Sequence, residues 1–163
     1  MKLSTRGRYA LRMMLDLAKN HGEEKPVSLT AIARRTGLSR GYLEQLALAL
    51  RMAKLLRGVS GRSGGYRLAR PAAQISIGEI IEATIGPVCL VDCLDDPESC
   101  VKSTNCECRL VYALINHRIT EVLRSFTLAD LLDPKGMSSV GRQLEEQPLV
   151  VKVEAGRGAL SPG

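Results

Sequence analysis

Aromatic residues are scarce in this chain of 163 residues: they make up 3% of it, with no Trp and one Phe. Hydrophobic residues still reach 45%, so aliphatic side chains and Met must fill the interior. Such a composition is more typical of a small helical protein than of a β-sandwich. The chain also lacks any apolar stretch close to the ~20 residues that span a bilayer, so we expect no membrane segment and no membrane partner.

Signals for export and for catalysis are missing as well. The N-terminal sequence MKLSTRGRYALRMMLDLA has charged residues where a signal peptide needs an apolar run, which predicts a cytoplasmic protein. There is no P-loop, no G-x-G-x-x-G after a predicted strand and no Ser/His/Asp arrangement. The two histidines, His21 and His117, are isolated in the sequence. We therefore predict that the chain is not an enzyme and has no small-molecule substrate.

Positive charge is concentrated in the first part of the chain. Residues 1–70 contain 15 Lys/Arg and 4 Asp/Glu, a balance of +11. Residues 71–163 contain 8 Lys/Arg and 13 Asp/Glu, a balance of −5. This asymmetry is expected of a segment that faces a polyanion such as DNA, although a solvated basic surface would show it too.

The basic segment has the pattern of a helix-turn-helix. A helix is predicted from Thr5 to about Gly22. Ser28 can cap a short second helix that stops at Gly37, and Ser39 can cap a third helix. The inward face of the third helix carries Leu43, Leu46 and Leu50. A short helix, a glycine turn and a second helix in this order are typical of DNA-binding motifs, and also of ordinary helical hairpins.

A β-hairpin is predicted directly after the third helix. Residues 55–59 and 66–68 have the pattern of two short strands, and the loop 60–65 between them is rich in Gly and Ser. Basic residues lie on or beside this hairpin at Arg57, Arg62, Arg67 and Arg70. The order favours a DNA-binding wing over a plain surface hairpin. The predicted fold is mostly α with a small β-hairpin wing, a winged helix-turn-helix.

The second half predicts one more core helix, a loop and a long helix. Ser76 and Glu79 form a capping box that opens a helix. Its inward side should carry Ile77, Ile80, Ile81 and Ile85. Residues 88–105 show no helical period, and a long helix follows at about 106–125. Its broad apolar seam, which includes positions 111, 115, 119, 122 and 126, predicts a homodimer, the alternative being packing within the chain.

These elements suggest four regions. Residues 1–87 form the winged helix-turn-helix domain, and residues 88–108 form a cysteine-rich loop. Residues 109–133 comprise the dimerisation helix and a short final helix that Thr127 opens. Residues 134–163 are poor in periodicity and hold no aromatic residue, which predicts a mostly disordered tail.

The outer side of the third helix and the wing tip offer candidate DNA contacts. A helix in the major groove presents its solvent side to base edges, where Gln can pair with adenine and Glu can accept from cytosine. Because a carboxylate is repelled by phosphates, Glu44 suggests base selection, unless it is only a surface residue paired with Arg40 or Arg51. The predicted DNA-binding residues are Ser39, Arg40, Tyr42, Glu44, Gln45, Arg51 and Arg62.

All the cysteines lie in one short window, at Cys89, Cys93, Cys100, Cys106 and Cys108. An odd number of cysteines in a cytoplasmic protein argues against a disulfide set. Structural zinc is an alternative, but the paired C-x2-C spacing of common zinc sites is absent. Thiolates on a pliable loop beside a helix start favour an iron–sulfur cluster.

Several separate blocks resemble the IscR-like family of iron–sulfur cluster regulators, whose relatives include NsrR and CymR. The blocks are MKLSTRGRYALRMMLDLA, GLSRGYLEQL, GRSGGYRLAR with ISIGEII, and FTLADLL, and the similarity extends to about residue 133. The resemblance implies a winged helix-turn-helix, a dimer made by the long helix, and three loop cysteines that hold a 2Fe–2S or 4Fe–4S cluster. It also implies that the loss or gain of the cluster alters promoter choice.

The resemblance carries the three cluster cysteines onto Cys93, Cys100 and Cys106. The IscR position for a ligating His, three residues after the third cysteine, is Arg109 here, which cannot ligate iron. The fourth ligand is then Cys108 or Cys89. The family's DNA-facing glutamate corresponds to Glu44. Arg62 is displaced by two positions from the family's wing arginine.

Together these patterns predict a homodimeric regulator that binds promoter DNA, senses iron–sulfur cluster status and controls cluster biogenesis genes. We favour a 2Fe–2S cluster over a 4Fe–4S cluster. Two alternatives remain. One is a regulator that responds to nitric oxide or redox change through the same cluster, and the other is a zinc-stabilised DNA-binding module without a sensing role.

Overall fold

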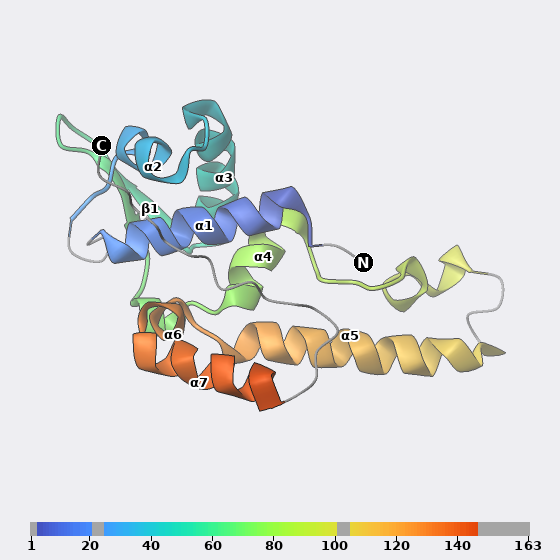
Figure 1. Cartoon of the computed structure of the whole chain (residues 1–163). Coiled ribbons are helices and arrows are strands. Elements are labelled where there is room, and N and C mark those ends of the chain that lie inside the picture. Colours follow the sequence, from blue (N-terminus) through green and yellow to red (C-terminus); the bar gives the residue numbers. More distant parts are fainter. Residues whose placement is uncertain (1–2, 21–24, 101–104, 147–163) are drawn as a thin grey trace. The chain divides into compact units, whose positions relative to one another are not determined.

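The computed structural model describes residues 3–20, 25–100 and 105–146 (Figure 1). The chain divides into one unit that ends at Leu132 and another that begins at Asp133. The described elements of the first unit are α1 (Thr5–Lys19), α2 (Leu29–Thr36), α3 (Arg40–Met52), β1 (Leu56–Val59), β2 (Gly65–Leu68), η1 (Ala72–Gln74), α4 (Ile77–Ile85), η2 (Asp92–Leu94), η3 (Pro97–Ser99), α5 (Glu107–Ser125) and α6 (Leu128–Leu132). The described element of the second unit is α7 (Pro134–Glu146).

Local capping explains where three of the helices, α2, α3 and α4, begin. The predicted caps at Ser28, Ser39 and Ser76 are confirmed, since each side chain accepts a hydrogen bond from a backbone N–H of the first turn. Ser76 and Glu79 complete the predicted capping box. Burial raises the pKa of Glu79, but hydrogen bonds from Ser76 and Arg70 outweigh it and hold that pKa below its ordinary value.

The core lies among the helices of the winged domain. The largest fully buried side chains are Met13, Met14, Leu17, Ile32, Leu43, Leu46, Leu50, Leu55, Ile75, Ile80, Ile81 and Leu128. The inward leucines predicted on the third helix are among them. The prediction was wrong for Ile85, which is 38% exposed. Ile85 is the last residue of α4, where the chain leaves the helix at Gly86 with φ +84°.

The wing is a two-stranded antiparallel hairpin, as predicted. Its register pairs Leu56 with Leu68 and Val59 with Gly65. Val27, just before α2, forms an isolated bridge to Tyr66 through two N–H···O bonds of 2.8 and 2.9 Å. A Cβ on Gly65 would lie 2.5 Å from the Val27 carbonyl oxygen, so this close approach needs glycine. The wing is thereby attached to the start of α2.

The C-terminal end of α5 is joined to the winged domain through backbone and side-chain contacts. The Ile77 N–H donates to the Phe126 carbonyl, and the Leu128 N–H donates to the Ile75 carbonyl, both at 2.9 Å. Arg124 forms an ion pair with Glu82 of α4 at 3.1 Å. A change in the position of α5 would therefore act directly on α4 through these contacts.

Two regions differ from the sequence prediction or lie outside the described residues. The predicted disordered tail begins with a helix, α7, because the Asp133 carboxylate accepts from the N–H groups of Lys135 and Gly136, both at 3.0 Å, and Pro134 suits the first helical position. Residues 147–163 lie outside the described residues, as does the predicted end of the first helix at residues 21–22; α1 ends at Lys19. Within the described ranges, no helix is long and apolar enough to cross a membrane.

Candidate functional site

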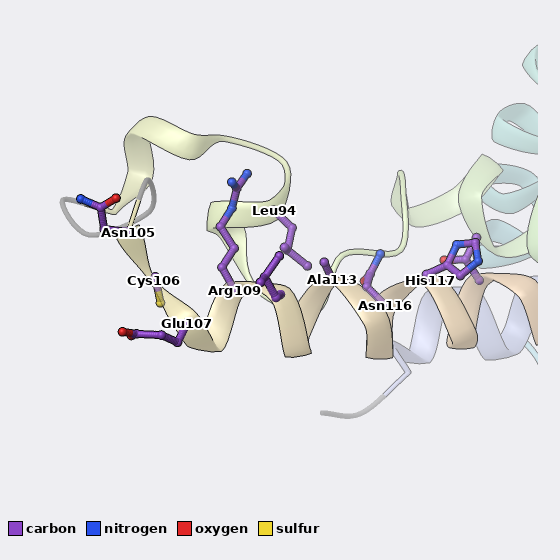
Figure 2. Close-up of a pocket in the computed structure, with 10 residues that line it drawn as sticks. Leu94, Asn105, Cys106, Glu107, Arg109, Ala113, Asn116 and His117 are labelled. Atoms are coloured by element: carbon purple, nitrogen blue, oxygen red, sulfur yellow. The ribbon is translucent and has the colours of Figure 1, made fainter.

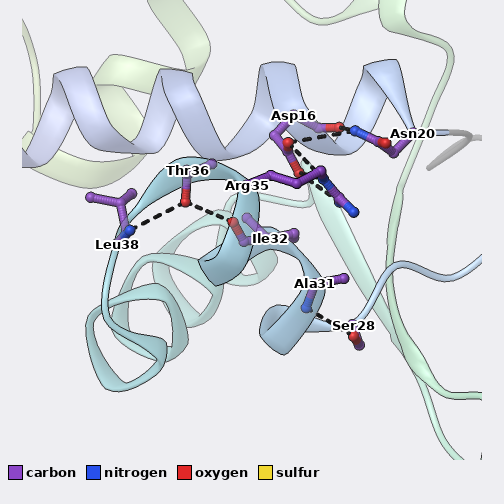
Figure 3. Close-up of polar contacts among 8 residues, drawn as sticks. All are labelled: Asp16, Asn20, Ser28, Ala31, Ile32, Arg35, Thr36 and Leu38. Atoms are coloured by element: carbon purple, nitrogen blue, oxygen red, sulfur yellow. Dashed lines mark hydrogen bonds and ion pairs between the residues drawn. The ribbon is translucent and has the colours of Figure 1, made fainter. Parts of the chain in front are cut away.

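The helix-turn-helix is braced against α1 by an ion pair. The Arg35 guanidinium donates from Nε to Asp16 Oδ1 at 2.9 Å and from Nη2 to Oδ2 at 2.8 Å (Figure 3). This fork raises the pKa of Arg35 above its ordinary value, chiefly through the hydrogen bond to Asp16. The Asp16 side chain is only 12% exposed, so it is screened less than a surface carboxylate. The contact fixes α2, and thus the turn before α3, against α1.

The turn itself is held by one threonine and one glycine. The Thr36 hydroxyl donates to the Ile32 carbonyl at 2.8 Å and accepts from the Leu38 N–H at 3.4 Å (Figure 3). Gly37 ends α2 with φ +73°, a left-handed conformation that favours glycine. These contacts set the direction in which α3 leaves the turn.

The outer face of α3 carries an exposed ion pair. Arg40 Nε lies 3.0 Å from Glu44 Oε1, and the two side chains are 67% and 53% exposed. Of the two partners considered for Glu44 in the sequence, the structure pairs it with Arg40. Gln45 is exposed beside it. A guanidinium, a carboxylate and a carboxamide therefore lie on the surface that a major groove would meet.

Ser39 and Tyr42 have structural contacts in addition to their predicted DNA contacts. The Ser39 hydroxyl accepts from the Tyr42 N–H at 3.3 Å as the cap of α3. The Tyr42 ring is half-buried and packs edge-on against Tyr9 of α1, with centroids 5.9 Å apart. Only part of the Tyr42 side chain is available at the surface.

Basic side chains also lie at the wing. Arg62 is exposed in the wing loop and lines an open groove of about 540 Å³ with Lys25 and Arg35. Arg51 is exposed on the last turn of α3, where its guanidinium carbon lies 4.0 Å from the position of a Cβ built on Gly58 of β1. Sequence reasoning missed Lys25, because only the folded chain brings it beside the wing loop.

The five cysteines are free thiols. Cys93 and Cys106 are half-buried, while Cys89, Cys100 and Cys108 are exposed. Cys106 is the residue that precedes α5, and Cys93 lies in η2. Unpaired thiols fit the donor chemistry of an iron–sulfur cluster. Across residues 3–20, 25–100 and 105–146, however, no three His, Cys, Asp or Glu side chains are gathered closely enough to hold a metal ion.

Two side chains of α5 are hydrogen-bonded to the backbone of the cysteine segment, the part of the cysteine-rich loop that contains Leu90 and Cys93. Arg109 Nε donates to the Cys93 carbonyl at 3.1 Å, and Asn116 Oδ1 accepts from the Leu90 N–H at 2.8 Å. Both α5 side chains line an open groove of about 910 Å³, where Leu94 from the segment lies above the helix (Figure 2). Sequence reasoning did not find these contacts, because residues 16 and 26 positions apart make them.

The long helix presents apolar side chains to solvent. Leu110, Val111, Leu114, Ile115 and Val122 are 78%, 56%, 58%, 41% and 56% exposed. The predicted apolar seam is therefore largely unburied within this chain, at the positions that the structure describes. Among the residues that the structure describes, packing within the chain leaves these five side chains exposed.

The helix α3, the turn before it and the attached wing form a winged helix-turn-helix. This fold and the relatives, which are named as transcriptional regulators, define the class of the protein: a DNA-binding transcription regulator and not an enzyme. The chain belongs to the Rrf2 family, described as iron-dependent transcriptional regulators, whose match covers residues 3–134.

Individual relatives are consistent with this assignment. The chain is 42% identical to the transcriptional regulator CymR of Bacillus subtilis over 131 residues, which cover 80% of this chain and 89% of the relative. It is 41% identical to IscR of Vibrio vulnificus over 132 residues, covering 81% and 77%. Among solved structures, IscR of T. potens matches with a TM-score of 0.66 and 41% identity over 81% of this chain and 86% of that one.

Proposed function

We propose that this transcription regulator senses an iron–sulfur cluster held by Cys93, Cys100 and Cys106, and that it controls genes of cluster biogenesis. The observation that carries the proposal is the set of free thiols on a segment tethered to α5, a helix joined at its other end to the DNA-binding domain. The family's iron dependence and the similarity to IscR support it.

The cluster that we propose is 2Fe–2S, with Cys108 or Cys89 as the fourth ligand. Cys108 is exposed in the first turn of α5, two residues after Cys106. The Cys89 thiol lies 3.1 Å from the Val91 carbonyl and donates to it. When bound, the cluster would supply a group whose gain or loss responds to iron, oxidants or nitric oxide. Because the described thiols are not gathered, cluster binding requires the segment to close around the group.

The operator contacts that we propose are the exposed residues of α3 and the wing. Glu44 and Gln45 would read base edges, and Arg40 would contact a guanine or a phosphate. Arg51 and Arg62 would contact backbone or minor groove, while Ser39 and Tyr42 would complete the α3 surface.

A homodimer is the proposed assembly, formed by the apolar face of α5. Burying several exposed aliphatic side chains of each copy would supply the driving force. A two-fold dimer would present two recognition helices to an operator with two half-sites. As a promoter-binding protein, it would act in the cytoplasm.

The test is anaerobic purification followed by visible spectroscopy and analysis of iron, sulfide and zinc. We expect a coloured protein with iron and sulfide in equal amounts. Each of the changes Cys93→Ala, Cys100→Ala and Cys106→Ala should abolish the chromophore. Because either Cys89 or Cys108 is the fourth ligand, only one of Cys89→Ala and Cys108→Ala should alter it. A colourless protein with stoichiometric zinc would refute the sensing function and favour a zinc-stabilised module.

A further inference from the structure

Arg109 is hydrogen-bonded to two of the proposed cluster cysteines. Its backbone N–H donates to the Cys106 carbonyl at 3.1 Å, as the first helical bond of α5. Its side-chain Nε donates to the Cys93 carbonyl at 3.1 Å. Arg109 thus connects Cys106, the residue before α5, to Cys93, which lies 13 positions earlier in the sequence.

Asn116 makes a second contact on the same side of α5. Arg109 and Asn116 are seven residues apart, about two helical turns or 10 Å along the axis. Their partners, Cys93 and Leu90, are joined by a chain in which Val91 is extended, with φ −145° and ψ 142°. The segment from Leu90 to Cys93 therefore lies along α5 and is held at two points. Asn116 holds it at Leu90, and Arg109, nearer to the start of α5, holds it at Cys93 (Figure 2).

Arg109 cannot act as an iron ligand, because a guanidinium stays protonated and offers donors only. Its hydrogen bond goes to a backbone oxygen of Cys93, which leaves the thiol free for other contacts. The positive charge of the guanidinium also lies beside Cys93, whose thiolate would be negative when it ligates metal.

We infer that Arg109 is a positioning residue for the cluster: it holds Cys93 next to the start of α5, and Asn116 holds the segment that leads to Cys93. The inference rests on the proposed function, since it concerns the same cysteines. These two hydrogen bonds reduce the loss of conformational freedom that cluster binding would cost, because the chain at Cys93 is already held on α5.

The test compares full-length Arg109→Ala, Asn116→Ala and the control Arg118→Ala. Arg118 lies on the same helix, but it forms its ion pair with Glu121, which also belongs to α5. Amide hydrogen exchange is measured on cluster-free protein. In η2 and just after it, the Leu94 N–H bonds to the Val91 carbonyl and the Asp95 N–H to the Asp92 carbonyl.

We expect Arg109→Ala to speed the exchange of the Leu94 and Asp95 amides on the order of tenfold, the effect of losing a hydrogen bond to a charged group. Asn116→Ala should speed the exchange of the Leu90 amide. Arg118→Ala should change none of these rates. Arg109→Lys keeps a cationic donor and should restore part of the protection.

A second readout is cluster occupancy after anaerobic reconstitution with ferrous iron and sulfide. Arg109→Ala should hold several-fold less cluster than Arg118→Ala, and Arg109→Lys should lie between them. Unchanged exchange at Leu94 and Asp95 in Arg109→Ala would show that the hydrogen bond from Arg109 does not hold Cys93 on α5. Faster exchange with undiminished occupancy would overturn the positioning role and leave cluster binding intact. If the unaltered protein takes up no cluster, the proposed function itself fails.

Discussion

The exposed ion pair on α3, the helix that we propose to read DNA, gives a specific prediction about DNA selection. Arg40 and Glu44 are both mostly exposed, so their mutual attraction contributes little to folding, about 0.3–0.5 kcal/mol for a pair four residues apart on a helix. Removing either side chain should leave the fold intact. Changes in DNA binding can then be assigned to the exposed face of α3 rather than to a loss of folding.

If Glu44 accepts a hydrogen bond from a base, Glu44→Ala should lose about 1–3 kcal/mol of discrimination at that base pair. Binding to unrelated DNA should become slightly tighter, because a carboxylate facing phosphates has been removed. Arg40→Ala should instead weaken binding to all duplexes and lower the salt slope by about 1, as expected for a lost phosphate contact. Glu44→Gln is the matched control, since it removes the charge and keeps the shape.

The assay is fluorescence anisotropy over a series of salt concentrations. The probes are a duplex selected by the unaltered protein from a random library, and a scrambled duplex of the same composition. Equal effects of Glu44→Ala on the two duplexes would refute base selection by Glu44. An unchanged salt slope in Arg40→Ala would refute its phosphate contact.

Three further predictions concern stability and assembly. Asp16→Asn should lower the free energy of unfolding by about 1–2 kcal/mol, and Tm by about 2–8 °C, because Arg35 loses a charged partner. An unchanged Tm in calorimetry would contradict a stabilising role for this ion pair. The lowered pKa of Glu79 contributes stability that is present above its ordinary value of 4.5 and lost as the pH falls through the folded pKa, so Glu79→Gln should flatten the decline in acid denaturant titrations. Identical acid profiles would refute that assignment. Ile115→Asp should convert a dimer to a monomer in sedimentation analysis, while the control Met52→Asp, at an exposed apolar position of α3, should not. A dimer that survives Ile115→Asp would argue against the α5 interface.

Local signals explain what the sequence predicted well. A serine hydroxyl that caps a helix acts on a backbone N–H three residues away, so Ser28, Ser39 and Ser76 could be identified from the residues around them. The glycine turn before α3 and the period of the inward leucines are equally local. These signals were enough for the winged helix-turn-helix fold.

Contacts between distant residues could not be predicted in the same way. The bridge between Val27 and Tyr66 and the bond from Arg109 to Cys93 depend on how separate elements pack. In the sequence, Arg109 was notable only as a departure from the IscR ligand pattern. The helix α7 was missed because its glycines suggested a break, whereas Asp133 and Pro134 favour a helix start.

The candidate cluster site was predictable in composition but not in arrangement. Five cysteines within one short segment identify thiol chemistry, and the structure keeps all five unpaired. Their relative positions depend on a segment with few regular elements, where no local rule fixes the chain. The side chains that hold this segment come from α5, which begins only after it.

If a cluster on Cys93, Cys100 and Cys106 controls DNA binding, its removal must change operator affinity. The measurement is operator affinity for one anaerobic preparation before and after a chelator removes the cluster. Cys106→Ala serves as the matched variant that cannot hold the cluster. We expect that affinity for the selected duplex changes on cluster removal, while Cys106→Ala binds like the cluster-free protein in both samples. A protein that carries a full complement of iron and sulfide, and binds the duplex equally well after losing it, would contradict control of DNA binding by the cluster.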